Sequence, residues 1–211
     1  MTETGEQRPP QRGTMSLRPE ISGFDLPKMT RFIGCADPAV AARAEAHARA
    51  MYDRAGAEHV EAVVARLRQV ILGELKPGGI DAEEPALISA IIALSWFEQD
   101  HLETGSNLWK SAHLDWALDL PKELDGADQA AWDDARTLAE YAVLQRPLFG
   151  SHQDSDWTTY GYLSRDEVQR LLDHRQRFPQ LGEDAYGFAR DFFGWLGKIA
   201  AAGRDYWFYA Q

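Results

Sequence analysis

The pattern most typical of a metal site in this chain is a glutamate followed by a histidine at the end of an apolar segment. Glu98 and His101 are three residues apart, so on a helix their side chains would share one face. Helical di-iron proteins use two Glu-x-x-His pairs and two further glutamates, whereas this sequence contains one such pair. The competing interpretation is the polar end of a buried helix. Glu98 and His101 are therefore weak metal candidates, and no cofactor is expected.

A second group of chemically capable side chains lies in an irregular stretch over residues 146–163. It holds the candidate binding residues His152, Asp154, Asp156, Trp157 and Tyr160. Two carboxylates beside a histidine suit acid–base catalysis or the binding of a cation, and long loops in compact domains are often functional. The alternative is a polar surface loop that its aromatic residues attach to the core. The sequence leaves both interpretations open.

Nucleophilic catalysis has little support in the sequence. The single cysteine, Cys35, lies just before a predicted helix start, where a thiolate could be stabilised. An inert buried thiol is the simpler interpretation. The chain contains no Gly-x-Ser-x-Gly elbow, no phosphate-binding loop and no dinucleotide fingerprint. Whether the protein is an enzyme stays open.

Helices account for most of the elements that must position these residues. Apolar residues recur every three or four positions over 58–75, which predicts an amphipathic helix. The segment that follows Glu84-Pro85 is apolar nearly all round as far as Phe97, which is typical of the centre of a bundle. Further helices are expected over residues 40–54, 108–120, 127–144, 164–175 and 183–202, and residues 25–33 form a short amphipathic segment. The fold class is therefore mainly all-α, a bundle-like domain of about six or seven helices.

Local signals mark several ends of these elements. Asp37-Pro38 starts a helix, because the aspartate can cap it and proline fits the first helical position. Ser164-x-x-Glu167 predicts a capping box. The aromatic run 206–209 favours a short C-terminal strand, and residues 21–24 are the candidate partner that such a strand needs.

Length and composition place limits on the class of protein. The chain has 211 residues, which suits one domain with a sizeable core. With 22 basic and 33 acidic residues the net charge is -11, which argues against nucleic acid as a partner. No run is long and apolar enough for a spanning helix, and the polar N-terminus is unlike a signal peptide. We therefore expect a cytoplasmic protein that does not insert into membranes.

The first residues differ from the rest of the chain. Residues 1–15 are polar, contain two adjacent prolines and predict a disordered tail, whereas residues 16–211 are expected to form the single helical domain. Either Met1 or Met15 could be the start of the natural protein. The sequence does not indicate the oligomeric state.

The C-terminal third contains an ordered series of short motifs. The residues that carry it are Arg146, Pro147 and Leu148, then Tyr162, Leu163, Glu167 and Val168, then Ala200, Ala201 and Gly203. The series resembles uncharacterised bacterial YfbM-like proteins, which contain a domain of unknown function, and their relatives. The resemblance covers residues 145–211 and implies a cytosolic helical domain. It implies no activity and no catalytic residues.

Two classes of function follow from these observations. A net charge of -11 would speed the encounter with a basic protein, so the first hypothesis is a protein-binding module, for example an immunity-type or regulatory partner. The second is a small enzyme or metal-binding protein that uses Glu98 and His101 or the 152–160 loop. A third is a small-ligand sensor with a pocket between helices.

Overall fold

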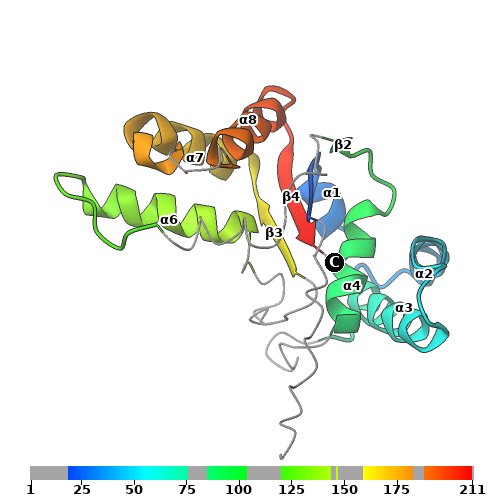
Figure 1. Ribbon diagram of the computed structural model, residues 1–211. Coiled ribbons are helices and arrows are strands. Elements are labelled where there is room, and N and C mark those ends of the chain that lie inside the picture. Colours follow the sequence, from blue (N-terminus) through cyan, green and yellow to red (C-terminus); the bar gives the residue numbers. More distant parts are fainter. Residues whose placement is uncertain are drawn as a thin grey trace, which may run out of the picture.

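The computed structural model describes residues 19–75, 85–103, 120–143, 146, 159–182 and 188–210. In this part of the chain a four-stranded antiparallel sheet separates two groups of helices (Figure 1). The strand order is β2-β1-β4-β3. The strands are β1 (Pro19–Phe24), β2 (Leu102–Glu103), β3 (Thr159–Leu163) and β4 (Asp205–Ala210). The predicted tail and the predicted helix over 108–120 lie outside the described residues, and the single-domain assignment stays a prediction.

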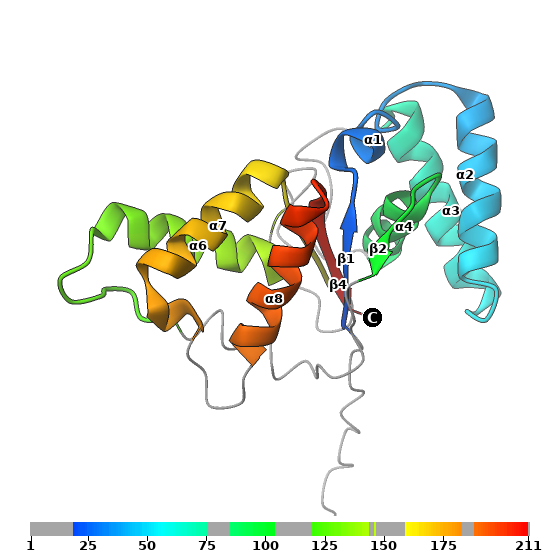
Figure 2. The same ribbon diagram turned by 90° about the horizontal axis from the view of Figure 1, so that it is seen from above.

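The helices cover both faces of the sheet (Figure 2). One layer contains α1 (Leu26–Thr30), α2 (Pro38–Met51), α3 (Ala57–Leu72) and α4 (Pro85–Trp96). The other contains α6 (Gln129–Val143), α7 (Arg165–Arg177), the short 3-10 helix η2 (Pro179–Gly182) and α8 (Phe188–Ala201). The mainly helical fold class is confirmed. The helices are divided between the two sides of a sheet, an arrangement that the helical periodicity alone did not indicate.

Alternating side chains of β4 enter two separate cores. Trp207 and Tyr209 pack with α1–α4, whereas Tyr206 and Phe208 pack with α6–α8. This is the two-residue period of a strand that is covered on both faces. The C-terminal strand is thus the central element of the fold.

The predicted partner of that strand is also confirmed. β1 runs antiparallel to β4, and Ile21 lies opposite Phe208 while Ser22 lies opposite Trp207. On its other edge β4 pairs with β3, where Tyr160 lies opposite Tyr209. The sequence indicated an irregular stretch as far as residue 163, and this prediction is wrong for residues 159–163, which form β3. The backbone of this segment adds the edge strand to the sheet, and its two tyrosine rings stack on Trp207 of β4.

Several helix ends follow the local chemistry of their residues. The Asp37 carboxylate accepts from the backbone N–H of Ala39, and Pro38 occupies the first helical position of α2. Ser164 and Glu167 form the predicted capping box of α7. α3 ends where Gly73 adopts a φ of 73°, a left-handed conformation that favours glycine.

The α4 helix is buried on all sides, as its composition predicts. Every residue from Ala86 to Ser95 is buried, between α3 and the sheet. In the described parts of the chain, none of the helices combines the length and apolar character needed to cross a membrane.

Candidate binding site

Glu98 and His101 lie beyond the end of α4 rather than on one helical turn. The helix ends at Trp96, and Glu98 has a φ of 53°, which is uncommon for a residue other than glycine. The prediction that Glu98 and His101 share a helical face is therefore wrong. Glu98 instead forms an ion pair with Arg43 of α2 at 3.1 Å. Among the described residues there is no group of three or more side chains that could hold a metal ion.

The His101 ring is held by hydrogen bonds at both of its nitrogens. Nε2 lies 2.8 Å from the carbonyl oxygen of Ser95, and Nδ1 lies 2.7 Å from the hydroxyl oxygen of Ser22 on β1. Because a carbonyl oxygen only accepts, Nε2 carries a hydrogen, and in the neutral ring Nδ1 accepts from the Ser22 hydroxyl. The ring also stacks on the Trp96 indole, with centroids 3.7 Å apart and planes 10° apart. Ser22 and Ser95 thus hold the His101 ring in place, and the Trp96 indole stacks on that ring.

A serine that donates to an oriented histidine has the hydrogen-bond order of a nucleophilic pair. Ser22, however, is only 4% exposed and lies in an interior strand between β2 and β4. A carbonyl substrate would have to pass through packed side chains to reach its hydroxyl. In the structure as described, the pair therefore supports Trp96 and is closed to a substrate.

A pocket of about 430 Å³ lies beside this supported tryptophan. Its walls come from β1, α2, α4 and β4, and the residues are Glu20, His47, Ala50, Met51, Trp96 and Tyr209. The three residues from α2 are spaced by three and four positions, so they share one helical face. The volume lies within the range of about 300–1,000 Å³ that is typical of small-molecule sites.

Among the described residues that line the pocket, Glu20 contributes the one carboxylate, and the surface is otherwise mainly apolar. The Tyr209 hydroxyl donates to Glu20 Oε2 at 2.6 Å, and burial together with Glu20 raises the pKa of Tyr209, so Tyr209 stays protonated. Burial lowers the pKa of His47, which favours the neutral imidazole. Nε2 of His47 and Nε1 of Trp96 are buried, without a hydrogen-bond partner within the described residues, so these nitrogens are not offered to a ligand. Glu20 is therefore the only charged residue among the six.

Of the loop residues singled out in the sequence, Tyr160 is the one that the structure describes. His152, Asp154, Asp156 and Trp157 lie outside the described residues. Tyr160 lies on β3, is 1% exposed and stacks on Trp207 with ring centroids 5.4 Å apart. This position agrees with the interpretation that aromatic residues attach the loop to the core.

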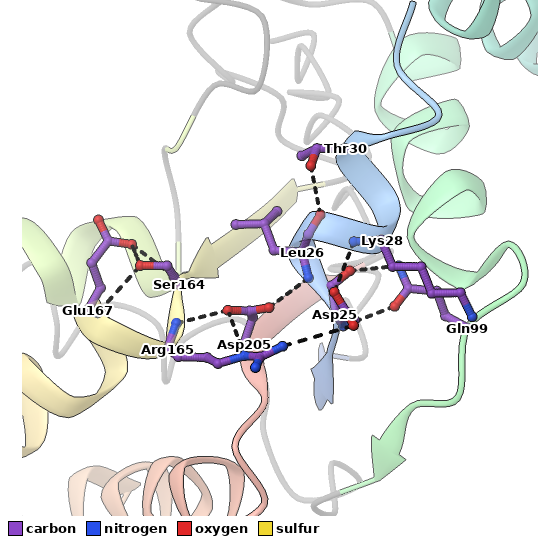
Figure 3. A network of polar contacts seen from close by, with 9 residues as sticks. All are labelled: Asp25, Leu26, Lys28, Thr30, Gln99, Ser164, Arg165, Glu167 and Asp205. Carbon is purple, nitrogen blue, oxygen red and sulfur yellow. Dashed lines mark hydrogen bonds and ion pairs between the residues drawn. The ribbon is translucent and has the colours of Figure 1, made fainter. Parts of the chain in front are cut away.

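A buried carboxylate, that of Asp205, occupies the opposite end of the β1–β4 pair from Glu20 and Tyr209, and Figure 3 shows its contacts. Asp205 is 3% exposed, and its oxygens accept the backbone N–H groups of Leu26 at 2.7 Å and Arg165 at 2.8 Å. These are the first residues of α1 and α7, which belong to the two different helical layers. Asp205 thus joins the two layers through one side chain.

Two motifs that are distant in the sequence meet at the start of α7. Arg146 donates to Glu167 at 2.5 Å, and its guanidinium lies 4.6 Å from the ring centroid of Tyr162. Burial would raise the pKa of Glu167, but the bonds from Arg146 and Ser164 outweigh it and lower that pKa. The contacts connect residues that carry the resemblance noted in the sequence, and they stabilise the fold locally.

The lowered pKa predicts that Glu167 contributes to loss of stability in acid. Its contribution is present above the unfolded pKa of about 4.3 and is lost as the pH falls through the lower folded value. In Glu167→Gln the amide can keep the capping box while the charge is removed. We expect Glu167→Gln to be about 1 kcal/mol less stable than wild type at neutral pH. Its free energy of unfolding should then fall less than that of wild type on acidification. Urea unfolding at about pH 7, 4 and 3 measures both effects, and parallel curves for the two proteins would contradict this role of Glu167.

Comparison with known proteins gives no match for this chain, whether to a family model, a curated protein or a solved structure. The resemblance to YfbM-like proteins therefore stays a prediction.

Proposed function

We propose that this protein is a cytoplasmic protein-binding module for a basic partner protein. The observation that carries the proposal is the pocket between α2, α4 and the sheet, in which Glu20 is the only charged residue among the described residues that line it. A net charge of -11 over the chain adds long-range attraction for a positively charged protein and disfavours nucleic acid.

The walls of the pocket are positioned before any partner arrives. Trp96 rests on His101, which two hydrogen bonds hold in place, and Glu20 is held by Tyr209. Preformed walls reduce the conformational entropy that binding has to overcome. This arrangement supports recognition of a partner more directly than it supports catalysis.

The second candidate function, a small enzyme or metal-binding protein, has weaker support among the described residues. Glu98 is paired with Arg43, and both ring nitrogens of His101 are hydrogen bonded. The enzyme hypothesis therefore depends on His152, Asp154 and Asp156.

Capture of the tagged protein from its native lysate, followed by direct binding of the purified captured partner, tests the proposed function. We expect a basic partner that binds stoichiometrically and whose association slows as ionic strength rises, since electrostatic steering is screened by salt. Binding only to acidic or neutral proteins, with no dependence on salt, would contradict the proposal.

A further inference from the structure

We propose that the pocket beside Trp96 receives a lysine side chain of the partner, with the lysine ammonium bound to Glu20. This inference rests on the proposed function and names the group that the partner presents. It follows from the charge, the hydrogen bonding and the shape of the pocket.

The charge of the pocket selects a cation. Glu20 is the only charged residue among the described residues of the walls, and burial favours neutral His47. An anionic group would meet the Glu20 carboxylate, and none of the described wall residues carries a positive charge to balance it. A cationic group would instead form a charge-assisted hydrogen bond with that carboxylate.

The hydrogen bonding of Glu20 favours an ammonium over a guanidinium. Oε2 already accepts the Tyr209 hydroxyl, whereas Oε1 has no partner within the described residues. A guanidinium binds best with two parallel hydrogen bonds to both carboxylate oxygens, while an ammonium is a compact point charge that needs one. Since Oε2 already accepts from Tyr209, a bidentate guanidinium would have to share that oxygen with the hydroxyl, whereas an ammonium can bind Oε1 alone, and the geometry favours lysine over arginine.

The apolar part of the pocket matches the stem of a lysine. Ala50 and Met51 of α2 and the indole of Trp96 contribute the apolar walls. Lysine buries its methylene groups along such surfaces while its ammonium reaches a polar rim. Tryptophan is also the aromatic residue that attracts a cation most strongly.

Blocked amino acids test this inference without knowledge of the partner. The probes are Nα-acetyl-lysine amide, its arginine analogue and Nα-acetyl-norleucine amide, which keeps an apolar side chain but lacks the ammonium. We measure the indole N–H resonance of Trp96, assigned with Trp96→Phe, as each probe is added. The expected result is a saturable shift with lysine at millimolar concentrations, and an affinity about tenfold weaker for norleucine.

Matched variants show whether Glu20 supplies the charge. In Glu20→Gln the side-chain oxygen can still accept from Tyr209, so only the charge is lost. Glu58→Gln removes one charge from the exposed surface of α3, at a residue that does not line the pocket. We expect Glu20→Gln to weaken lysine binding about tenfold and Glu58→Gln to leave it unchanged, with both variants melting near the wild-type temperature.

Different results would overturn different claims. Equal shifts with lysine and norleucine, tighter binding of the arginine probe, or an unchanged affinity in Glu20→Gln would each overturn the lysine site. If the captured basic partner binds Glu20→Gln and wild type equally, the inference fails while the proposed function stands. If lysine binds as expected but the captured partner is not basic, the proposed function fails and the pocket remains a site for alkylammonium groups.

Discussion

Replacing Gly161 by alanine is expected to destabilise the protein by about 3 kcal/mol. Gly161 is in the middle of β3, on the face covered by α6. A Cβ at this position would lie 2.4 Å from the carbonyl oxygen of Ala142 and 2.7 Å from that of Tyr141. Both atoms belong to the backbone of α6, so the strain cannot be relieved by rotating a side chain. The strand and the helix would have to separate, which would loosen the contact of β3 with the core formed by α6–α8.

Gly194 provides a control of opposite sign. It is exposed on α8, and a Cβ built there meets nothing within 4 Å among the described residues. Glycine within a helix is less favourable than alanine by about 0.5–1 kcal/mol, so Gly194→Ala is expected to stabilise the fold slightly. Chemical unfolding of the two variants beside wild type measures both effects. Equal stability of Gly161→Ala and wild type would show that α6 does not press on β3 at this position.

The sequence predicted the elements whose determinants are local. Asp37 and Ser164 cap helices through their own side chains, and the periodicity of residues 58–75 describes a helix without reference to the rest of the chain. The strand near the C-terminus was predictable because four consecutive aromatic residues favour extended backbone. Its partner was predictable because a single strand cannot satisfy its own hydrogen bonds.

The features that depend on packing were not predictable in the same way. Thr159–Leu163 contains a glycine and has small polar neighbours, a composition that indicates a loop. The segment is a strand because it pairs with β4 and packs against α6. The pocket escaped prediction because Glu20 and Tyr209 are 189 positions apart and meet only through the β1–β4 register. His101 was identified from the sequence, but its actual partner, Ser22, is 79 positions away on another element.

Replacing Asp205 by alanine is expected to cost about 3 kcal/mol of folding stability. The substitution removes the acceptor for the first N–H groups of α1 and α7, which belong to opposite helical layers. Hydrogen bonds to a charged group contribute about 1.5–3 kcal/mol each, and part of this sum is offset because alanine does not require a carboxylate to be desolvated. Chemical unfolding measures the loss.

Arg165→Ala separates the two kinds of contact at this position. The Arg165 side chain is half exposed and lies 3.7 Å from Asp205 and 3.9 Å from Asp25, whereas its backbone N–H makes the short bond to Asp205. The alanine variant keeps that N–H, so we expect a loss below about 1 kcal/mol, as for exposed ion pairs. If Arg165→Ala were as unstable as Asp205→Ala, the ion pair rather than the bridging of two helix starts would hold the layers together.

The pH dependence of the Asp205 effect has the opposite sign to that of Glu167. Burial raises the pKa of Asp205 above its usual range, despite the two N–H donors and Arg165. Its contribution to stability is thus fully present below the unfolded pKa of about 3.9 and is reduced as the pH rises through the higher folded value. Acidification from about pH 7 to pH 4 should therefore not shrink the difference between wild type and Asp205→Ala. If the stability difference between wild type and Asp205→Ala disappeared in acid, the folded protein would favour the ionised carboxylate. Only in that case does protonation of Asp205 weaken the hydrogen bonds that join the two helical layers.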